Sequence, residues 1–416
     1  MRLAMVAWCV LALSASARSG AQEGGPAFDM SGRVRLRFDD ARSQPDSTLT
    51  LARQLGLPGV QVAPATALLA TDIKLAAGPV VAAATLGQAR EQGQGWSGYA
   101  RLNELSASGS ALGWYYTAGR KIVSWDVGWG FRPNDLIQQE ARLVLTDATL
   151  QGRPLLMVEK FDDDAAWSLV AVNPARSARS VGGDEPALAA RYFRHVGAFD
   201  LHGFGRWGAR THGSIGAALS WVASENTELH ASWNGAQALD TLCVEPVQGL
   251  VGATPARDCT TGRAQRILLG STWSSADNLT VVTEWWWDGG APAEQRWRDW
   301  YRRNRSLSQL AAHVGPADRL PLAANLAWQS DALLQTNLHR SNVLASFNWA
   351  DEKYAFSLYA LWHPADAGRI YTATMGWSAS GWELNGGARL YGGPRTSVTA
   401  QLPARWQLYL GGSWKF

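Results

Sequence analysis

Charge and long apolar runs are both scarce in this sequence of 416 residues. Only 18% of the residues are charged, the formal net charge is +3, and lysine is rare beside arginine. So small a net charge excludes a chain that binds nucleic acid through a broad basic surface. Beyond the N-terminal residues, no apolar run reaches the roughly 20 residues that a transmembrane helix requires. The sequence therefore predicts neither a nucleic-acid partner nor a bundle of membrane-spanning helices.

Cysteine is almost absent as well. The chain has three cysteines, of which Cys9 lies in the N-terminal apolar run. Cys243 and Cys259 remain as a pair in one predicted loop, and in an oxidising compartment we expect them to form a disulfide. A zinc site would need further ligands, and none cluster around this pair. We expect no metal and no cofactor.

The motifs of common hydrolases are also missing. The sequence has no Gly-x-Ser-x-Gly elbow and no His-Glu-x-x-His zinc motif. Its seven histidines are scattered, and only His195 and His202 flank one tight turn. We therefore predict that the chain is not an enzyme. A site assembled across strands, with a serine beside His230 or His339, is the alternative.

The N-terminal residues have the features of a secretion signal. Arg2 supplies a positive charge, residues 3–13 form an apolar run, and small residues up to Ala21 form a cleavage site. The run is too short to cross a bilayer as a helix. We expect residues 1–21 to be a removed signal peptide and residues 22–416 to form the mature domain.

The sequence is rich in tryptophan and in segments where apolar and polar residues strictly alternate. It contains 22 tryptophans, many of them near the ends of alternating segments. In the last thirteen residues, Trp406, Leu408 and Trp414 share one face, and Gln407 and Ser413 lie on the other. A period of two with one apolar and one polar face is typical of a strand between two environments. Aromatic residues at strand ends are typical of membrane interfaces.

About eighteen such strands follow one another along the chain, with sixteen as the alternative count. The predicted ranges are 32–38, 65–76, 80–88, 99–108, 111–122, 153–161, 166–172, 187–196, 199–210, 214–222, 227–233, 264–272, 279–287, 338–349, 354–362, 369–377, 382–391 and 404–416.

The connections between these strands alternate in length. Short turns, such as 274–277 and 350–352, fall between segments as long as 123–152 and 288–337. Outer-membrane barrels have short turns on one side and long loops on the other, whereas a soluble sandwich shows no such parity. The sequence therefore predicts an all-β fold, a transmembrane antiparallel β-barrel whose two termini both lie in the periplasm.

The inward faces of the predicted strands are polar, and the outward faces are apolar. A cylinder of about eighteen strands is too wide for side chains alone to fill, so we expect water or an inserted loop inside it. The predicted wall of the lumen consists of Arg33, Arg35, Arg37, Lys74, Arg101, Arg206, Glu284, Arg340, Glu383, Arg389 and Arg405.

Residues 118–140 form the most informative segment. A strand ends near Arg120, and charged and aromatic side chains then follow without alternation. We expect this loop to fold into the lumen and narrow it, with its carboxylates paired to arginines of the wall. The predicted constriction residues are Arg120, Lys121, Trp125, Asp126, Trp129, Arg132 and Asp135. The alternative is that Trp125, Trp129 and Phe131 only pack a structural plug against the wall.

This segment resembles a motif of poorly characterised proteobacterial outer-membrane barrels, which are loosely similar to the alginate-export and porin-like superfamily. Those proteins carry a strand ending in Gly-Arg, then Val-Ser-Trp, then Gly-x-Gly-Phe-x-Pro-x-Asp, here at 119–120, 123–125 and 128–135. The sequence departs from the motif at Asp126, where glycine is expected. The closing strand also resembles that of outer-membrane barrels, which implies that Trp414 and Phe416 form a signal for the barrel-assembly machinery.

A second segment, 292–312, has the spacing of a helix. Trp297, Trp300 and Tyr301 fall on one helical face, and several arginines crowd the same stretch. Because guanidinium groups bind phosphate and carboxylate in a bidentate manner, this helix is predicted to be either a basic gate or a site for an anionic sugar or lipopolysaccharide phosphate. The alternative is a helical lid with solvated arginines.

Together these patterns predict a porin-like channel in the outer membrane of a Gram-negative bacterium. It would pass small polar solutes, with the arginines favouring anionic or carbohydrate-like ones. The alternatives are an export channel for a polysaccharide or lipid-like product and a sealed barrel that acts as an adhesin or scaffold. Expected partners are outer-membrane lipid, lipopolysaccharide, the assembly machinery and a small solute. A homo-oligomer stays open as a further partner, although nothing in the sequence marks its interface.

Overall fold

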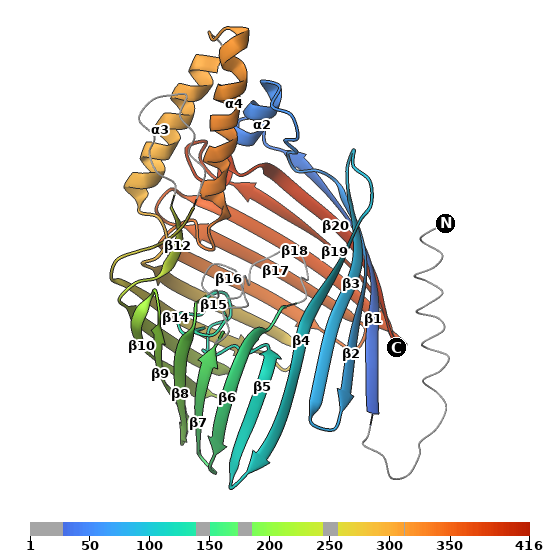
Figure 1. The fold of residues 1–416 in the computed structure, drawn as a ribbon, viewed down its shortest axis with the longest axis vertical. Coiled ribbons are helices and arrows are strands. Elements are labelled where there is room, and N and C mark those ends of the chain that lie inside the picture. The colour runs from blue at the N-terminus through green and yellow to red at the C-terminus, as the bar shows by residue number, and fades with distance from the viewer. Residues whose placement is uncertain (1–27, 139–149, 174–184, 244–256, 312) are drawn as a thin grey trace.

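The computed structural model describes residues 28–138, 150–173, 185–243, 257–311 and 313–416. The predicted signal peptide, residues 1–21, lies outside the described residues. Eighteen antiparallel strands form one closed sheet, in which β1 pairs with β20 (Figure 1). The prediction of an all-β antiparallel barrel is confirmed, and the alternative of sixteen strands is wrong.

The barrel strands follow the order of the chain, and each overlaps one predicted range. They are β1 (Phe28–Ser43), β2 (Thr66–Ala77), β3 (Val80–Glu91), β4 (Ser97–Ala111), β5 (Trp114–Lys121), β6 (Arg153–Phe161), β7 (Ala165–Val172), β8 (Ala187–Val196), β9 (Phe199–Gly208), β10 (His212–Ser224), β11 (Thr227–Ala236), β14 (Ala264–Ser274), β15 (Leu279–Asp288), β16 (Ser341–Ala350), β17 (Tyr354–His363), β18 (Gly368–Ala379), β19 (Trp382–Gly392) and β20 (Ala404–Lys415).

The two faces of the barrel follow the alternation in the sequence. On β1, Leu36 and Phe38 point outward and are 44% and 51% exposed, whereas Arg35 points inward and pairs with Asp72 of β2. An apolar outer face with a polar inner face is the pattern expected of a barrel that stands in lipid. Among the described residues, no helix is both long enough and apolar enough to cross a bilayer.

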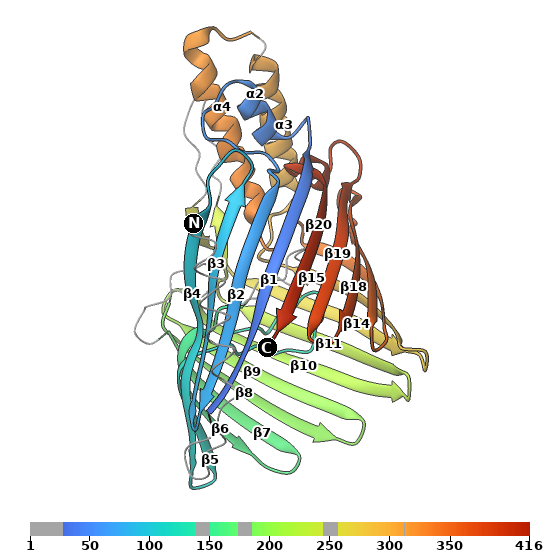
Figure 2. The ribbon, with the colours of Figure 1, turned by 90° about the vertical axis from the view of Figure 1, so that its right-hand side faces the viewer.

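The connections differ between the two ends of the barrel. One end has only short turns, for example 78–79, 112–113 and 380–381. The other end carries the helices: α2 (Thr48–Gln54) follows β1, while α3 (Glu294–Ala311), α4 (Pro316–Ser330) and η1 (Asp331–Leu334) follow β15. It also carries η2 (Thr399–Gln401) and the hairpin of β12 (Asp240–Cys243) and β13 (Arg257–Thr260). Two views show α2, α3 and α4 together above this end (Figures 1 and 2).

The helices α2, α3 and α4 share a small apolar core of their own. Ala52 of α2 packs with Leu307 of α3 and with Leu322 and Leu326 of α4, and all four are fully or almost fully buried. Because α2 and the α3–α4 pair come from loops at distant points of the sequence, this core ties the β1–β2 connection to the β15–β16 connection.

The closing strand is held by both backbone and aromatic contacts. The Phe416 amide donates to the Gly32 carbonyl, the Gly32 amide donates to the Phe416 carbonyl, and both distances are 3.0 Å. The ring of Phe416 covers Gly32 so closely that a Cβ there would overlap it. Trp414 lies between the rings of Trp382 and Phe416, at centroid distances of 6.2 and 5.3 Å. The seam between β20 and β1 is therefore closed to its last residue.

Candidate functional site

Residues 122–138, which follow β5, lie against the inner wall of the barrel, and we call them the inserted segment. Val123, Trp125 and Ile137 are buried in one cluster with inward-facing side chains of β6–β10. The wall residues of this cluster are Leu155, Met157, Val170, Val172, Ala187, Ala189, Phe204 and Ala218. Part of the inner face of these strands is thus apolar, and the segment covers that part.

A single carboxylate of the wall fixes the middle of the inserted segment. Glu284 of β15 accepts hydrogen bonds from the amides of Trp129, at 2.6 Å, and Gly130, at 2.7 Å. Nε2 of His230, on β11, lies 3.0 Å from the same carboxylate. The side chain of Glu284 is fully buried, and a buried charge is tolerated only with such partners. Glu284 was predicted as part of the lumen wall, and the structure places it under the inserted segment.

Asp126 lies at a backbone conformation that favours glycine. Its φ is +97°, which explains why the resembling motif has glycine at this position. Its carboxylate accepts hydrogen bonds from the Asn134 amide at 2.6 Å, the Ser232 hydroxyl at 2.8 Å and the Val127 amide at 2.9 Å. We expected the carboxylates of the loop to pair with arginines of the wall. Asp126 instead bonds to backbone amides and to a hydroxyl of β11.

Asn134 makes the second polar attachment to the wall. It is fully buried, and its Nδ2 donates to Ser232 Oγ at 2.8 Å and to the Trp233 carbonyl at 3.0 Å. Its Oδ1 accepts from Asn234 Nδ2 at 3.1 Å. A Cβ at Gly216 would overlap Asn134 Oδ1, so the wall is shaped to receive this amide.

Aromatic rings extend the attachment towards β17. Phe131 stacks on Trp286 of β15 at a centroid distance of 5.8 Å, and Trp129 stacks on Tyr359 of β17 at 5.3 Å. Phe131, Trp286, Leu268 and Leu344 form a buried cluster with Trp129 at its edge. The contacts of the inserted segment therefore reach from β6 round to β17.

Inward side chains of β1 and β19 form a different surface, which we call the arginine strip: Arg33, Arg35 and Arg37 on β1, and Arg389 on β19. Arg35 lies 2.7 Å and Arg33 lies 3.7 Å from Asp72 Oδ2. The guanidinium group of Arg37 stacks over the ring of Tyr409 at 4.1 Å and pairs with Asp39. Arg389 Nε donates to Thr372 at 2.8 Å. Cationic side chains dominate this strip, held in place by carboxylates, a hydroxyl and an aromatic ring.

The remaining predicted wall residues lie at several levels of the lumen, and Arg101 is in the same row as Arg33 and Asp72. Glu383 pairs with Lys415 near the short turns, and Lys74 shares the inward face of Asp72 on β2. Arg101 lies over the ring of Tyr99 at 5.5 Å. Near the long loops, Arg340 donates to the Ala291 carbonyl at 3.0 Å, and Arg405 is exposed beside an irregularity in the β1–β20 pairing.

Arg206 belongs to a polar group at the long-loop end. It lies 2.8 Å from Glu185, whose carboxylate also accepts from the Thr211 hydroxyl and the Arg210 amide. Burial acts to raise the pKa of Glu185, but these hydrogen bonds and the charge of Arg206 lower that pKa to about 2. Glu185 is therefore a structural anion that joins the β7–β8 connection to β9.

The predicted constriction residues fall in different places. Arg120 was expected in the constriction, but the structure places it on the outer face of β5. It pairs with Leu105 of β4, which points outward and is 47% exposed. Its guanidinium donates to the Gly152 carbonyl at 2.8 Å. Lys121 pairs opposite Arg153 where the segment begins. Arg132 donates to the Gly128 carbonyl and Ser124, and Asp135 accepts from Ser124 at 3.1 Å.

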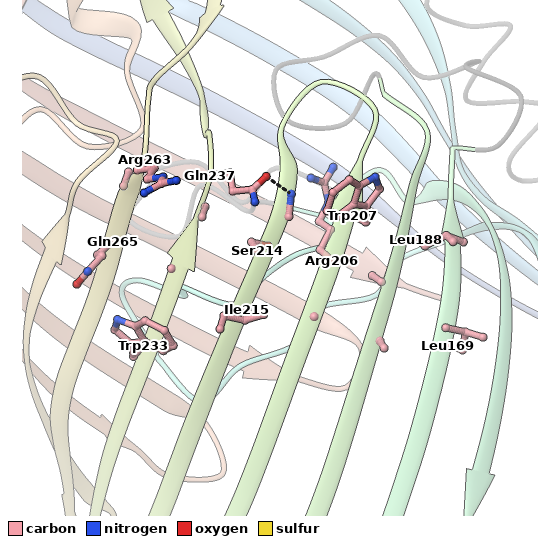
Figure 3. Close-up of a pocket in the computed structure, with 17 residues that line it drawn as sticks. Leu169, Leu188, Arg206, Trp207, Ser214, Ile215, Trp233, Gln237, Arg263 and Gln265 are labelled. Atoms are coloured by element: carbon pink, nitrogen blue, oxygen red, sulfur yellow. Dashed lines mark hydrogen bonds between the residues drawn. The ribbon is translucent and has the colours of Figure 1, made fainter.

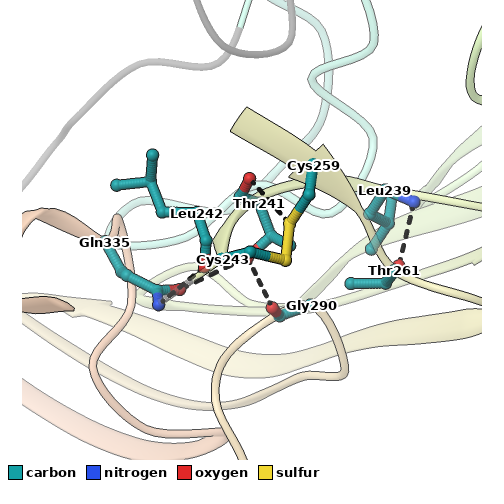
Figure 4. The surroundings of a disulfide bond; sticks show 8 residues. All are labelled: Leu239, Thr241, Leu242, Cys243, Cys259, Thr261, Gly290 and Gln335. Atoms are coloured by element: carbon teal, nitrogen blue, oxygen red, sulfur yellow. Dashed lines mark hydrogen bonds between the residues drawn. A yellow bond between two sulfur atoms is a disulfide. The ribbon is translucent and has the colours of Figure 1, made fainter. Parts of the chain in front are cut away.

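The loops above the lumen hold one another in place. Cys243 and Cys259 form a disulfide across the β12–β13 hairpin, with their Cα atoms 5.8 Å apart (Figure 4). Gln335, after η1, donates to the Leu242 carbonyl at 3.3 Å. The expected helix at 292–312 is α3, where Trp297 and Trp300 are buried. Its arginines at 298, 302 and 305 are exposed.

One polar group was not found from the sequence. His339 Nε2 lies 2.9 Å from Asp366, and the rings of His339 and His363 lie 5.0 Å apart. His363 Nδ1 lies 2.8 Å from the Asn342 side chain. Both histidines are 2% exposed, and Trp297 of α3 packs beside His339 at 6.2 Å. The group secures the base of the helical region to β16 and β17.

Comparisons with known proteins give a fold and no family. No family model and no curated protein matches the sequence. Among solved structures, the chain is similar to OccK11 (OpdR) of Pseudomonas aeruginosa, with 9% identity and a TM-score of 0.50 over 96% of this chain and 99% of that one. It is also similar to an engineered porin of Rhodopseudomonas blastica, with 11% identity and a TM-score of 0.42 over 94% and 100%. At this identity the first likeness shows a shared fold and nothing about the role.

Proposed function

We propose that the protein is an outer-membrane channel for the passive passage of small polar solutes, narrowed by the inserted segment. The observation that carries this proposal is the attachment of the segment to Glu284 and Asn134 on the inner wall. A loop held this way occupies part of the lumen and leaves the arginine strip to meet the solute.

The arginine strip supports a preference for anionic or carbohydrate-like solutes. Guanidinium groups bind carboxylate and phosphate through two parallel hydrogen bonds, and they also donate to hydroxyl groups. Arg33, Arg35, Arg37 and Arg389 lie along neighbouring strands β1 and β19–β20, so a solute could exchange from one guanidinium to the next. Rings of charge select ions in other channels by the same electrostatics.

The proposal includes a location and an orientation. The apolar outer face supports a location in a membrane, and the short turns would lie in the periplasm with both termini. A signal peptide at residues 1–21 and a closing strand read by the assembly machinery through Trp414 and Phe416 belong to the same proposal. The short turns offer little surface for a periplasmic machine, which disfavours the export alternative.

Planar-bilayer recordings of the purified barrel test the proposed function. We expect ion conductance and, under a salt gradient, a reversal potential that indicates anion preference. Replacement of Arg33 and Arg389 by glutamine should lower that preference, while replacement of the exposed Arg305 of α3 by glutamine should leave it unchanged.

A preference for cations that these two substitutions do not alter would refute the anion preference. A barrel without conductance, both as the wild type and after residues 123–138 are replaced by a short Gly-Ser linker, would favour the sealed barrel instead. Correct folding of each variant is checked by circular dichroism and by its shift on an unheated gel.

A further inference from the structure

The outer face of the barrel carries a hollow of about 820 Å³ across β7–β14 (Figure 3). One row of paired residues forms its floor: Leu169 lies opposite Ala190, and Ala190 lies opposite Gly205. Ile215 follows opposite Gly205, and then Gly235. Because alanine and glycine have so little side chain, the surface is sunken at Ala190 and Gly205. Leu169 and Ile215 stand out from the same row, 57% and 64% exposed, and the ring of Trp233 lies over Gly235. A Cβ at Gly205 would meet no atom within 4 Å.

Large apolar side chains that point away from the lumen flank the hollow on both sides. Leu188 and Trp207 pair with each other one step nearer the long loops and are 58% and 61% exposed. Trp233 lies on the opposite side, one step nearer the short turns. In a bilayer this surface faces hydrocarbon. Because an unfilled hollow loses the dispersion contacts of its lining, acyl chains or a protein must occupy it.

The rim on the long-loop side is cationic and rich in hydrogen-bond donors. Arg263 and Gln265 are exposed there, beside Gln237, whose Oε1 accepts from the Gly213 amide at 3.2 Å. None of the described residues that line the hollow is a carboxylate. The rim therefore complements an anionic headgroup, and a guanidinium is well suited to phosphate.

The width of the hollow decides between kinds of lipid. It extends over six neighbouring strands, β7 to β11 and β14, and adjacent strands are about 4.8 Å apart, which gives a width of roughly 24 Å. Several acyl chains fit side by side over that distance, whereas the two chains of a glycerophospholipid would fill only part of it.

We propose that this hollow is a binding site for one lipopolysaccharide molecule of the outer leaflet. Its acyl chains lie over Ala190 and Gly205, between Trp207 and the protruding Ile215 and Trp233. A phosphate of its lipid A is bound by Arg263 with the amides of Gln237 and Gln265. This inference depends on the outer-membrane location proposed above and not on the channel, so conductance and lipid binding are tested separately.

Native mass spectrometry of the full barrel in detergent, titrated with purified bis-phosphorylated lipid A, tests the site. We expect the wild type to bind one lipid A in preference to phosphatidylglycerol. The substitution Gly205→Trp fills the floor and should weaken binding at least tenfold. Arg263→Glu should weaken it similarly, and Arg263→Lys should retain it within about threefold. Ala373→Trp, on the outward face of β18, is the matched control and should bind as the wild type does.

Three results would overturn the proposal. The first is equal lipid A binding by the wild type and Gly205→Trp. The second is phosphatidylglycerol displacing lipid A at equal concentration, which would make the occupant an ordinary phospholipid. The third is a wild-type oligomer that Gly205→Trp converts to monomers without a change in lipid A binding, which would assign the hollow to a second copy of the chain.

Discussion

The attachment of the inserted segment at Glu284 gives the sharpest prediction. In Glu284→Gln, one oxygen still accepts an amide, but the new NH₂ group faces the amide of Trp129 or Gly130, and one buried N–H loses its acceptor. A hydrogen bond to a charged group contributes about 1.5–3 kcal/mol, and an unsatisfied buried donor costs about 1–3 kcal/mol. Both figures describe the same lost contact, so they are not added. We expect the docked state of the segment to be destabilised by roughly 3 kcal/mol.

A loss of that size is measurable without unfolding the barrel. Each 1.4 kcal/mol is a factor of ten in an equilibrium, so the undocked fraction should rise on the order of 100-fold. Hydrogen exchange at the amides of Trp129 and Gly130 should accelerate by about that factor, because exchange reports local opening. Single-channel recordings should show a noisier and larger conductance.

The matched control is Glu159→Gln on β6. Glu159 is also a carboxylate of the inner face, but it accepts from Ser168 of the neighbouring strand, so exchange in the inserted segment should stay as in the wild type. Unchanged exchange at Trp129 and Gly130 in Glu284→Gln would show that the wall carboxylate does not hold the segment. If exchange accelerated equally in Glu284→Gln and Glu159→Gln, the cause would be the loss of a negative charge in the lumen and not the loss of the hydrogen bonds to Glu284.

Three further predictions follow from other contacts. Gly216→Ala should push Asn134 off the wall and destabilise docking by about 1–3 kcal/mol; exchange at the Asn134 amide should rise, while Gly203→Ala, where a Cβ meets nothing, serves as the control. Glu185 has a pKa of about 2 in the folded protein, below its ordinary 4.5, so the stability that its ionised form contributes is present above pH 4.5 and is lost as pH falls towards 2. The melting temperatures of the wild type and Glu185→Gln should differ at pH 7 and converge near pH 2. An equal difference in melting temperature at both pH values would contradict this. Cys243→Ser with Cys259→Ser removes a bridge that closes about 15 residues, which constrains the unfolded loop by about 3 kcal/mol; proteolysis should become faster within the β12–β13 connection with the barrel melting point unchanged, and a lower barrel melting point would show that the hairpin supports the wall.

The barrel could be predicted because its signal is local and repeated. Each strand, such as β10 with Ile215 and Trp221 outward, shows its two faces within ten residues, and the closing strand repeats the pattern at the end of the chain. Arg120 was misplaced for a reason that is also local. The charge of Arg120 suggested that it belongs to the inserted segment. The alternation of β5 instead puts Thr117 and Gly119 inward and Arg120 outward.

The attachments of the inserted segment were beyond prediction from the sequence. Trp129 and Glu284 are 155 residues apart, and nothing near either of them indicates that a wall carboxylate accepts backbone amides. The expected pairing of loop carboxylates with arginines relied on opposite charges, whereas Asp126 is bound by amides and a hydroxyl at a positive φ. The apolar inner face of β6 and β7 likewise makes sense only with the segment lying over it.

The apolar part of the inner wall that lies under the inserted segment divides the interior of the barrel into two parts with different roles. On the side of Leu155, Met157 and Val170 the interior is dry and behaves like the core of a soluble domain, so changes there should impair assembly before they alter transport. On the side of the arginine strip, changes would alter which solutes the proposed channel passes. In the proposed channel, a route displaced from the central axis in this way would let selectivity evolve with little effect on the stability of the barrel.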